Sequence, residues 1–190
     1  DYTFADIFYM RLGIAYLQMG HTDEAIKMSE KSIQHGQNGF SSGSWYKSFI
    51  TATASLSLKG KNKEAIEYMN KVTSRFSPPN NFDKMLVNFA YANCYARIKN
   101  YGTAEKYFIK TGEAADALES PQTHRDVCNS YSTIALFYAN RADYKKTKFY
   151  LDKIEALSKK YNKKYASEAV YMSMYKLDSV NGDFKSALIN

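Results

Sequence analysis

The sequence is poor in residues that break helices, and it has no long apolar run. It contains 3 prolines and 9 glycines in 190 residues, and these are the residues that interrupt helices and mark turns. No stretch approaches the roughly 20 consecutive apolar residues of a membrane span. Apolar and polar residues do not alternate over more than about six positions, as they would in a half-buried strand. The sequence therefore predicts an all-α chain.

Residues that carry catalytic and metal chemistry are also scarce. The three histidines, His21, His35 and His124, share neither a helix face nor a ligand spacing. Cys94 and Cys128 lack the paired spacing of a zinc site, so we expect buried free thiols, with a disulfide between neighbouring helices as the alternative. The sequence has no phosphate-binding loop, no G-x-S-x-G and no H-E-x-x-H. We therefore predict no catalytic site, no metal site and no cofactor.

What the sequence does contain is a repeated pattern of a turn followed by an amphipathic helix. The clearest copy is G-K-N-K-E-A-I-E-Y-M-N-K-V, which begins at Gly60. A small residue follows each turn at intervals of about 40 residues, a period typical of helical arrays. These small residues, which fit where two helices cross most closely, are Ala25, Ala65, Ala104, Thr147 and Ala187. An apolar helical segment precedes each turn, so each unit is predicted to be helix A, a tight turn and helix B.

The repeated pattern resembles the tetratricopeptide repeat (TPR) family. The first unit matches best, with family-like residues at Tyr9, Leu12, Gly13, Tyr16, Gly20, Glu24, Ala25 and Ile26. Later units depart from the family because Lys99 and Ala142 stand where the turn glycine belongs. The period also exceeds the roughly 34 residues of an ordinary TPR. The resemblance implies a TPR-like α-α superhelix, a right-handed solenoid of about five helical hairpins.

We expect one TPR-like domain over residues 1–190. Its repeats are predicted at about 1–36, 43–76, 82–118, 121–161 and 163–190, with the last one cut short, as in a fragment of a larger protein. The fourth helix A is predicted to start at Ser120 and Pro121, because serine suits the cap and proline the first helical position.

The TPR resemblance implies a concave groove, lined by the A helices, that binds a protein or peptide. Counting from the repeat register, we predict that the groove is lined by Lys47, Phe89, Asn93, Arg97, Asn129, Ser132, Asn140 and Lys176. Side-chain amides that hold a peptide backbone, beside a cation for a carboxylate, suit peptide binding. The alternative is that these polar residues are simply solvated. Met10 and Ile14 stand where chaperone-tail-binding TPR proteins have lysine and asparagine, so that partner is not expected.

The chain is basic, with a net charge of +7 from 26 Lys and Arg against 19 Asp and Glu. The densest basic part consists of Lys145, Lys146, Lys148, Lys153, Lys159, Lys160, Lys163 and Lys164. It could bind acidic partners or phosphate, or it could be the solvated face of a helix and its connection to the next. No nucleic-acid-binding motif accompanies it, so we expect no nucleic acid to bind this segment.

A second resemblance involves residues 175–188, Y-K-L-D-S-V-N-G-D-F-K-S-A-L. This run is similar to the TPR sensor regions of Bacteroidetes transcriptional regulators and sensor kinases, in which the repeats precede a membrane span. The resemblance implies the sensory or interaction domain of a bacterial signalling regulator, in the periplasm and in a membrane-anchored parent protein. The alternative is a cytoplasmic adaptor or peptide-responsive regulator on the same scaffold. The oligomeric state is not predicted.

Overall fold

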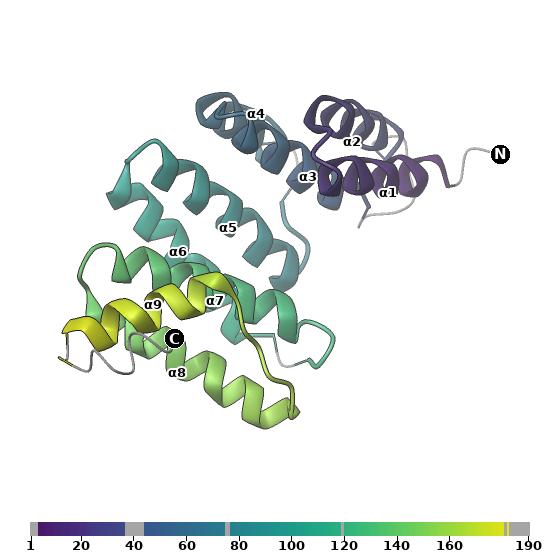
Figure 1. Ribbon diagram of the computed structural model, residues 1–190. Coiled ribbons are helices and arrows are strands. Elements are labelled where there is room, and N and C mark those ends of the chain that lie inside the picture. The colour runs from purple at the N-terminus through teal and green to yellow at the C-terminus, as the bar shows by residue number, and fades with distance from the viewer. Residues whose placement is uncertain (1–3, 37–43, 75–76, 119, 181, 183–190) are drawn as a thin grey trace. The chain divides into compact units, whose positions relative to one another are not determined.

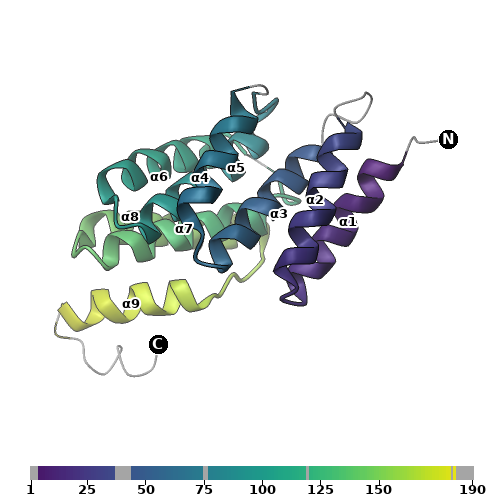
Figure 2. The same ribbon diagram turned by 90° about the horizontal axis from the view of Figure 1, so that it is seen from above.

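The structure is a computed structural model that describes residues 4–36, 44–74, 77–118, 120–180 and 182. Over these residues it forms nine α-helices and no strand (Figures 1 and 2). In chain order the helices are α1 (Ala5–Gln18), α2 (Thr22–Gly36), α3 (Ser44–Leu58), α4 (Asn62–Thr73), α5 (Asn81–Arg97), α6 (Tyr101–Asp116), α7 (His124–Ala139), α8 (Tyr144–Tyr161) and α9 (Glu168–Val180). They follow one another as helical hairpins, so the all-α prediction is confirmed. None of these described helices is long and apolar enough to cross a membrane.

The helices fall into two compact units, Asp1–Thr111 and Gly112–Asn190, and the boundary lies inside α6. In the first unit, each helix from α1 to α4 contacts the next along the chain. In addition, α1 contacts α3 and α3 contacts α5, so the A helices of this unit form one layer. In the second unit, α7 contacts both α8 and α9, drawn green to yellow in Figure 1. That one domain spans the whole chain stays a prediction.

The small residue predicted at each helix crossing is fully buried wherever the structure describes it. Ala25, Ala65, Ala104 and Thr147 are 0% exposed. Helices α1 and α2 approach closely at Gly13. A Cβ added to this residue would lie 3.3 Å from the carbonyl oxygen of Ala25. Ala187 lies outside the described residues. The predicted repeat register is thus confirmed at these four positions.

Four hairpin turns share one backbone conformation, although only two of them contain glycine. The residue at the turn has φ of 79° at Gly20, 76° at Gly60, 61° at Lys99 and 58° at Ala142. In each turn this residue's N–H donates to the carbonyl three residues earlier, and the next N–H donates to the carbonyl five residues before it. This pair of hydrogen bonds is the Schellman motif, which favours glycine because a Cβ costs about 1–2 kcal/mol in the left-handed region. Lys99 and Ala142 therefore do occupy the glycine position, as predicted.

Tyrosine side chains fill the contact between α5 and α6 in the first unit. The rings of Tyr91 and Tyr107 stack with centroids 4.7 Å apart, and Tyr95 stacks on Tyr107 at 5.7 Å. The Tyr91 hydroxyl donates to Oδ1 of Asn70 on α4 at 2.9 Å. Large planar rings thus supply the apolar contact area, while the hydroxyl at the ring's end keeps a hydrogen bond.

Asp116, in the last turn of α6, links that turn to α7 and α8 in the second unit. The hydroxyl of Tyr131, which is 3% exposed, donates to Oδ1 of Asp116. The Lys153 ammonium group on α8 donates to both carboxylate oxygens of Asp116. Beside them, Gly112 lies so close to Tyr150 that an added Cβ would be 2.9 Å from the hydroxyl oxygen. One carboxylate therefore holds three helices of this unit together.

The predicted start of the fourth helix A is wrong by several residues. Helix α7 begins at His124, and residues 121–123 form a turn. Ser120 caps this turn instead of the helix, because its Oγ accepts a hydrogen bond from the N–H of Gln122 at 3.2 Å. The shift places His124 and Arg125 in the first turn of α7.

Candidate functional site

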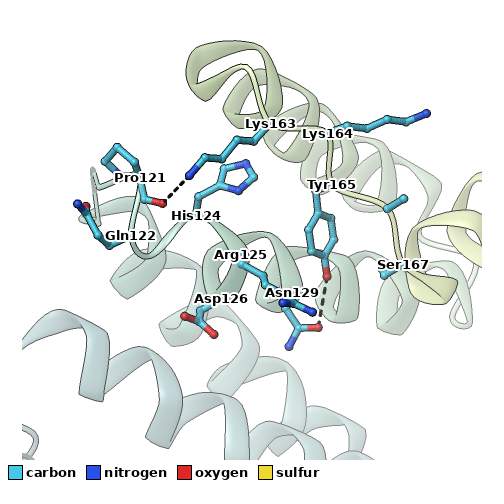
Figure 3. A pocket seen from close by; sticks show the side chains of 11 residues that line it. Pro121, Gln122, His124, Arg125, Asp126, Asn129, Lys163, Lys164, Tyr165 and Ser167 are labelled. Atoms are coloured by element: carbon cyan, nitrogen blue, oxygen red, sulfur yellow. Dashed lines mark hydrogen bonds between the residues drawn. The ribbon is translucent and has the colours of Figure 1, made fainter.

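The second unit contains a cleft of about 1060 Å³ along α7 (Figure 3). One wall is the turn before α7 together with the first turns of that helix, and the other is the connection from α8 to α9. The residues that line it are Pro121, Gln122, His124, Arg125, Asp126, Asn129, Lys163, Lys164, Tyr165, Ala166 and Ser167. Most of them are polar or charged, so the cleft suits a polar ligand.

The α8–α9 connection is fixed at both ends. Helix α8 ends at Asn162, whose φ of 49° lies in the left-handed region that asparagine tolerates. Residues 163–167 are neither helix nor strand. Helix α9 is capped by Ser167, whose Oγ accepts from the N–H of Val170 at 3.3 Å. These two caps hold the short connecting chain that forms one wall of the cleft.

Side chains of the connection point alternately towards and away from α7 (Figure 3). Lys163 reaches across to donate to the carbonyl oxygen of Pro121 at 3.5 Å. Tyr165 donates to Oδ1 of Asn129 at 3.4 Å. Lys164, between them, is exposed and points away from α7. This alternation is that of an extended chain, and both hydrogen bonds are long and hence weak.

Most lysines of α8 have an ion-pair partner, whereas the cations of the cleft have none among the described residues. Four of the predicted lysine set are held in ion pairs, which are Lys146 with Asp143, Lys148 with Asp152, Lys153 with Asp116 and Lys159 with Glu155. Arg125, Lys163 and Lys164 form no ion pair with any residue that the structure describes. The first turn of α7 adds the positive end of a helix dipole to the same wall. With three cations against the one carboxylate of Asp126 in its lining, the cleft is electropositive.

His124 lies in the wall of the cleft and is 5% exposed. Its Nε2 is 3.6 Å from Sγ of Cys128, and its ring meets the edge of Tyr161. Burial and then the nearby Lys163 lower the pKa of His124, so the ring is neutral at neutral pH. Burial raises the pKa of Cys128 to about 11, so this thiol stays protonated and is a poor nucleophile. Both cysteines are buried and free, as expected.

The residues predicted for the groove are divided between the two units. In the first unit, Lys47 and Arg97 are exposed, whereas Phe89 and Asn93 are half-buried. Nδ2 of Asn93 donates to the carbonyl oxygen of Phe89 at 2.8 Å, within its own helix. The side-chain amide of Asn93 thus already has one partner.

In the second unit, only Asn129 of the predicted residues lines the cleft. Asn140 is exposed as the C-cap residue of α7, and Lys176 is half-buried on α9. Ser132 is 0% exposed, and its hydroxyl donates to the carbonyl oxygen of Asn129 at 2.9 Å. Ser132 therefore cannot meet a ligand, because it faces the packed side of α7.

Arg125 and the connection at residues 163–167 are site features that the sequence did not predict. The basic stretch includes Lys163 and Lys164 but does not set them apart from the lysines of α8. Asn162, a residue common at left-handed helix ends, is the signal that the chain leaves α8 before these two lysines. Among the described residues, no cluster of three or more His, Cys, Asp or Glu side chains could hold a metal ion.

Comparison with known proteins identifies the class of fold. Residues 8–34 match the tetratricopeptide repeat family. The fold is similar to the nearly identical TPR-like repeats of a Podosopora anserina protein assigned as a kinesin light chain, with a TM-score of 0.65, 17% identity, and coverage of 95% of this chain and 88% of that one. A variant of those repeats with one residue replaced gives a TM-score of 0.66 at 16% identity, covering 97% and 91%. No curated protein matches the sequence.

The chain thus has the fold of a TPR-like repeat array. The match at residues 8–34 coincides with the first predicted unit, which carries most of the family's residues. The similarity in fold extends over nearly the whole chain, but the low identity carries no information on partners.

Proposed function

We propose that this chain is a non-enzymatic protein-interaction scaffold that binds an acidic peptide segment in the cleft of the second unit. The observation that carries the proposal is the set of three cations, Arg125, Lys163 and Lys164, which line the cleft without an ion-pair partner among the described residues. The lysines of the adjacent helix are largely paired with carboxylates of this chain. In the cleft, the carboxylates of a partner would supply the ion pairs that these three cations lack.

The expected affinity is modest and depends on salt. Exposed ion pairs contribute about 0.2–1 kcal/mol each, so three of them at about 0.7 kcal/mol each change the dissociation constant by about thirtyfold. The same pairs are screened as the ionic strength rises, since the Debye length falls to about 8 Å at physiological salt. Hydrogen bonds from Asn129 and Tyr165, whose mutual contact is long, would add to the binding.

The test is fluorescence anisotropy with a labelled peptide of alternating glutamate and threonine. The matched control peptide has glutamine in place of glutamate. The protein is expected to bind the glutamate peptide, and the variant with Arg125→Gln, Lys163→Gln and Lys164→Gln is expected to bind about thirtyfold more weakly. The variant Lys148→Gln, which replaces a lysine of α8 that is paired with Asp152, should bind as the unaltered protein does. Equal binding of both peptides, or of the triple variant and the unaltered protein, would contradict the proposal.

The groove predicted from the repeat register extends this proposal to the first unit. It is supported by the layer of A helices α1, α3 and α5, which is the element that lines the groove in the TPR family. Arg97 is exposed at the end of α5 and could meet a carboxylate. Replacing Arg97 and Asn93 with alanine should weaken the binding of a peptide ligand without unfolding the protein. Unchanged binding would remove this surface from the proposal.

A finer proposal is that the scaffold is the sensory or interaction domain of a bacterial signalling regulator in the periplasm. It is supported only by the similarity of residues 175–188 to sensor regions of such regulators. Sequencing the parent gene on both sides of this segment tests it. An export signal upstream, with a membrane span and a regulator domain downstream, is the expected result. A continuous run of repeats without either would favour the cytoplasmic adaptor.

A further inference from the structure

The backbone of the α8–α9 connection is unpaired where it borders the cleft. The N–H and C=O groups of Lys164, Tyr165 and Ala166 make no hydrogen bond with other described residues. Lys164 and Ala166 are exposed and Tyr165 is half-buried, so water can reach this stretch. Such a row of donors and acceptors has the properties of an edge strand, to which another extended chain can be added.

We propose that the acidic peptide segment binds as a short β-strand, with its backbone hydrogen-bonded to the N–H and C=O groups of Lys164 and Ala166, which share one edge of the extended connection. This inference rests on the proposed function, because the cleft and the acidic ligand are the same. What it adds is the conformation of the ligand and the groups that recognise it. Backbone pairing would provide affinity for many sequences, and the cations would select acidic ones.

The course of the connection supports this mode of binding. Lys163 and Tyr165 point towards α7 and Lys164 points away, which is the period of two that an extended strand requires (Figure 3). In an extended chain the backbone N–H and C=O groups lie sideways between these two directions. The groups of Lys164 and Ala166 therefore lie on one edge of the connection and those of Tyr165 on the other, and neither set is directed into α7.

The lining of the cleft argues against a helical ligand. A helix satisfies its own backbone groups and binds through an apolar face, which needs an apolar groove. Here Pro121, Ala166 and the ring of Tyr165 are the main apolar contributions to the lining, and charged or amide side chains supply most of the rest. An extended chain gains hydrogen bonds from this lining that a helix would not.

In an added strand, successive side chains of the ligand point to opposite sides. Carboxylates on every second residue would face one side of the added strand. Lys163 and Arg125, which lie on the α7 side, are the partners of carboxylates that face α7, and Lys164 is the partner of carboxylates on the opposite side of the strand. The hydrogen bonds from Lys163 to Pro121 and from Tyr165 to Asn129, at 3.5 and 3.4 Å, are weak enough to be exchanged for bonds to the ligand.

The test uses the glutamate–threonine peptide in two N-methylated forms. One form carries N-methyl groups on every glutamate and the other on every threonine, so each blocks the N–H groups on one edge of an added strand. We expect one form to bind at least about tenfold more weakly and the other to bind within about twofold of the parent peptide. Amide hydrogen exchange at Lys164 and Ala166 of the protein should slow in the complex with the parent peptide.

A pair of protein variants provides the matched control. Ala166→Pro removes one backbone N–H, and the restriction it places on Tyr165 is compatible with an extended chain. Ala166→Gly changes the same side chain but keeps the N–H. The proline variant should lose affinity and the glycine variant should keep it, with circular dichroism showing that both are folded.

The outcomes separate this inference from the proposed function. If the parent peptide binds but both N-methylated forms bind equally and exchange at Lys164 and Ala166 is unchanged, the strand model is overturned and the acidic-ligand proposal stands. If the parent peptide does not bind at all, the proposed function fails and the strand model falls with it.

Discussion

The two units are built from the same helical hairpins but differ in where their polar side chains are satisfied. In the first unit, the Asn93 amide bonds to its own helix and the Tyr91 hydroxyl bonds to Asn70. In the second, Asn129 accepts a hydrogen bond from the α8–α9 connection and three cations line a cleft. The repeat fold needs only buried apolar residues and small side chains at helix crossings. Polar groups that the fold does not use are therefore the best guide to a binding surface.

The largest effect is expected from reversing the charge of the connection. The double variant Lys163→Glu and Lys164→Glu should weaken binding of the glutamate–threonine peptide by about a hundredfold, because attraction is replaced by repulsion. The control, Lys148→Glu and Lys159→Glu, makes the same change in net charge on α8, where both lysines are paired. Anisotropy titrations at low salt measure both. Similar losses in the two variants would show that only net charge matters.

The second largest effect is expected when a buried tyrosine hydroxyl loses its hydrogen-bond acceptor, and the two units should differ in its size. Asp116→Ala should lower the free energy of unfolding by about 2 kcal/mol, because it leaves the buried Tyr131 hydroxyl without its acceptor. Asn70→Ala in the first unit should cost less, since the Tyr91 hydroxyl still lies 3.1 Å from Oγ1 of Thr73. Urea unfolding gives both values. A smaller cost for Asp116→Ala than for Asn70→Ala would contradict this account.

Substitutions at the hairpin turns should change the stability less. The change tested in the first unit should destabilise the protein, and the one tested in the second unit should stabilise it. Gly60→Ala should destabilise the protein by about 1 kcal/mol, because alanine is strained at a φ of 76°. Ala142→Gly should stabilise it by a similar or smaller amount, because glycine relieves the same strain at a φ of 58°. Nothing lies within 4 Å of a Cβ added at Gly60, so a steric clash does not complicate the comparison. Thermal unfolding of the two variants should move in opposite directions.

The smallest effect is a dependence of stability on pH that comes from His124. Its pKa is lower in the folded protein than in the unfolded chain, so the unfolded state binds the proton first. Stability from the neutral ring is fully present above the unfolded pKa of about 6.5 and is lost as the pH falls through the lower folded value. His124→Gln should flatten this part of the curve of unfolding free energy against pH. If the slope of this curve is unchanged in the variant, groups other than His124 cause the pH dependence.

The fold could be predicted because the repeat leaves local marks in the sequence. Ala25, Ala65, Ala104 and Thr147 recur with the period of the hairpins, and each is buried where two helices cross. Even Lys99 and Ala142 could be placed at the turn, because the register fixes the position whichever residue occupies it. These features depend on neighbours within one hairpin, and so a single sequence reveals them.

The site was harder to predict because it is made by a connection and not by a repeat. Counting along α7 places Ser132 on the surface, but α7 contacts both α8 and α9 and is buried on more than one face. Lys163 and Lys164 look like a continuation of the lysines in α8. The predicted unit boundary between residues 161 and 163 places them beyond that helix, but the course of residues 163–167 depends on packing against α7.

The most direct test of the central claim is an amide NMR titration of the protein with the glutamate–threonine peptide. The account predicts the largest shifts at Arg125, Asn129 and residues 163–167, with the rest of α8 little changed. Shifts concentrated on α5, at Asn93 and Arg97, would instead place the binding surface in the first unit. The absence of shifts at saturating peptide would contradict binding of acidic segments altogether.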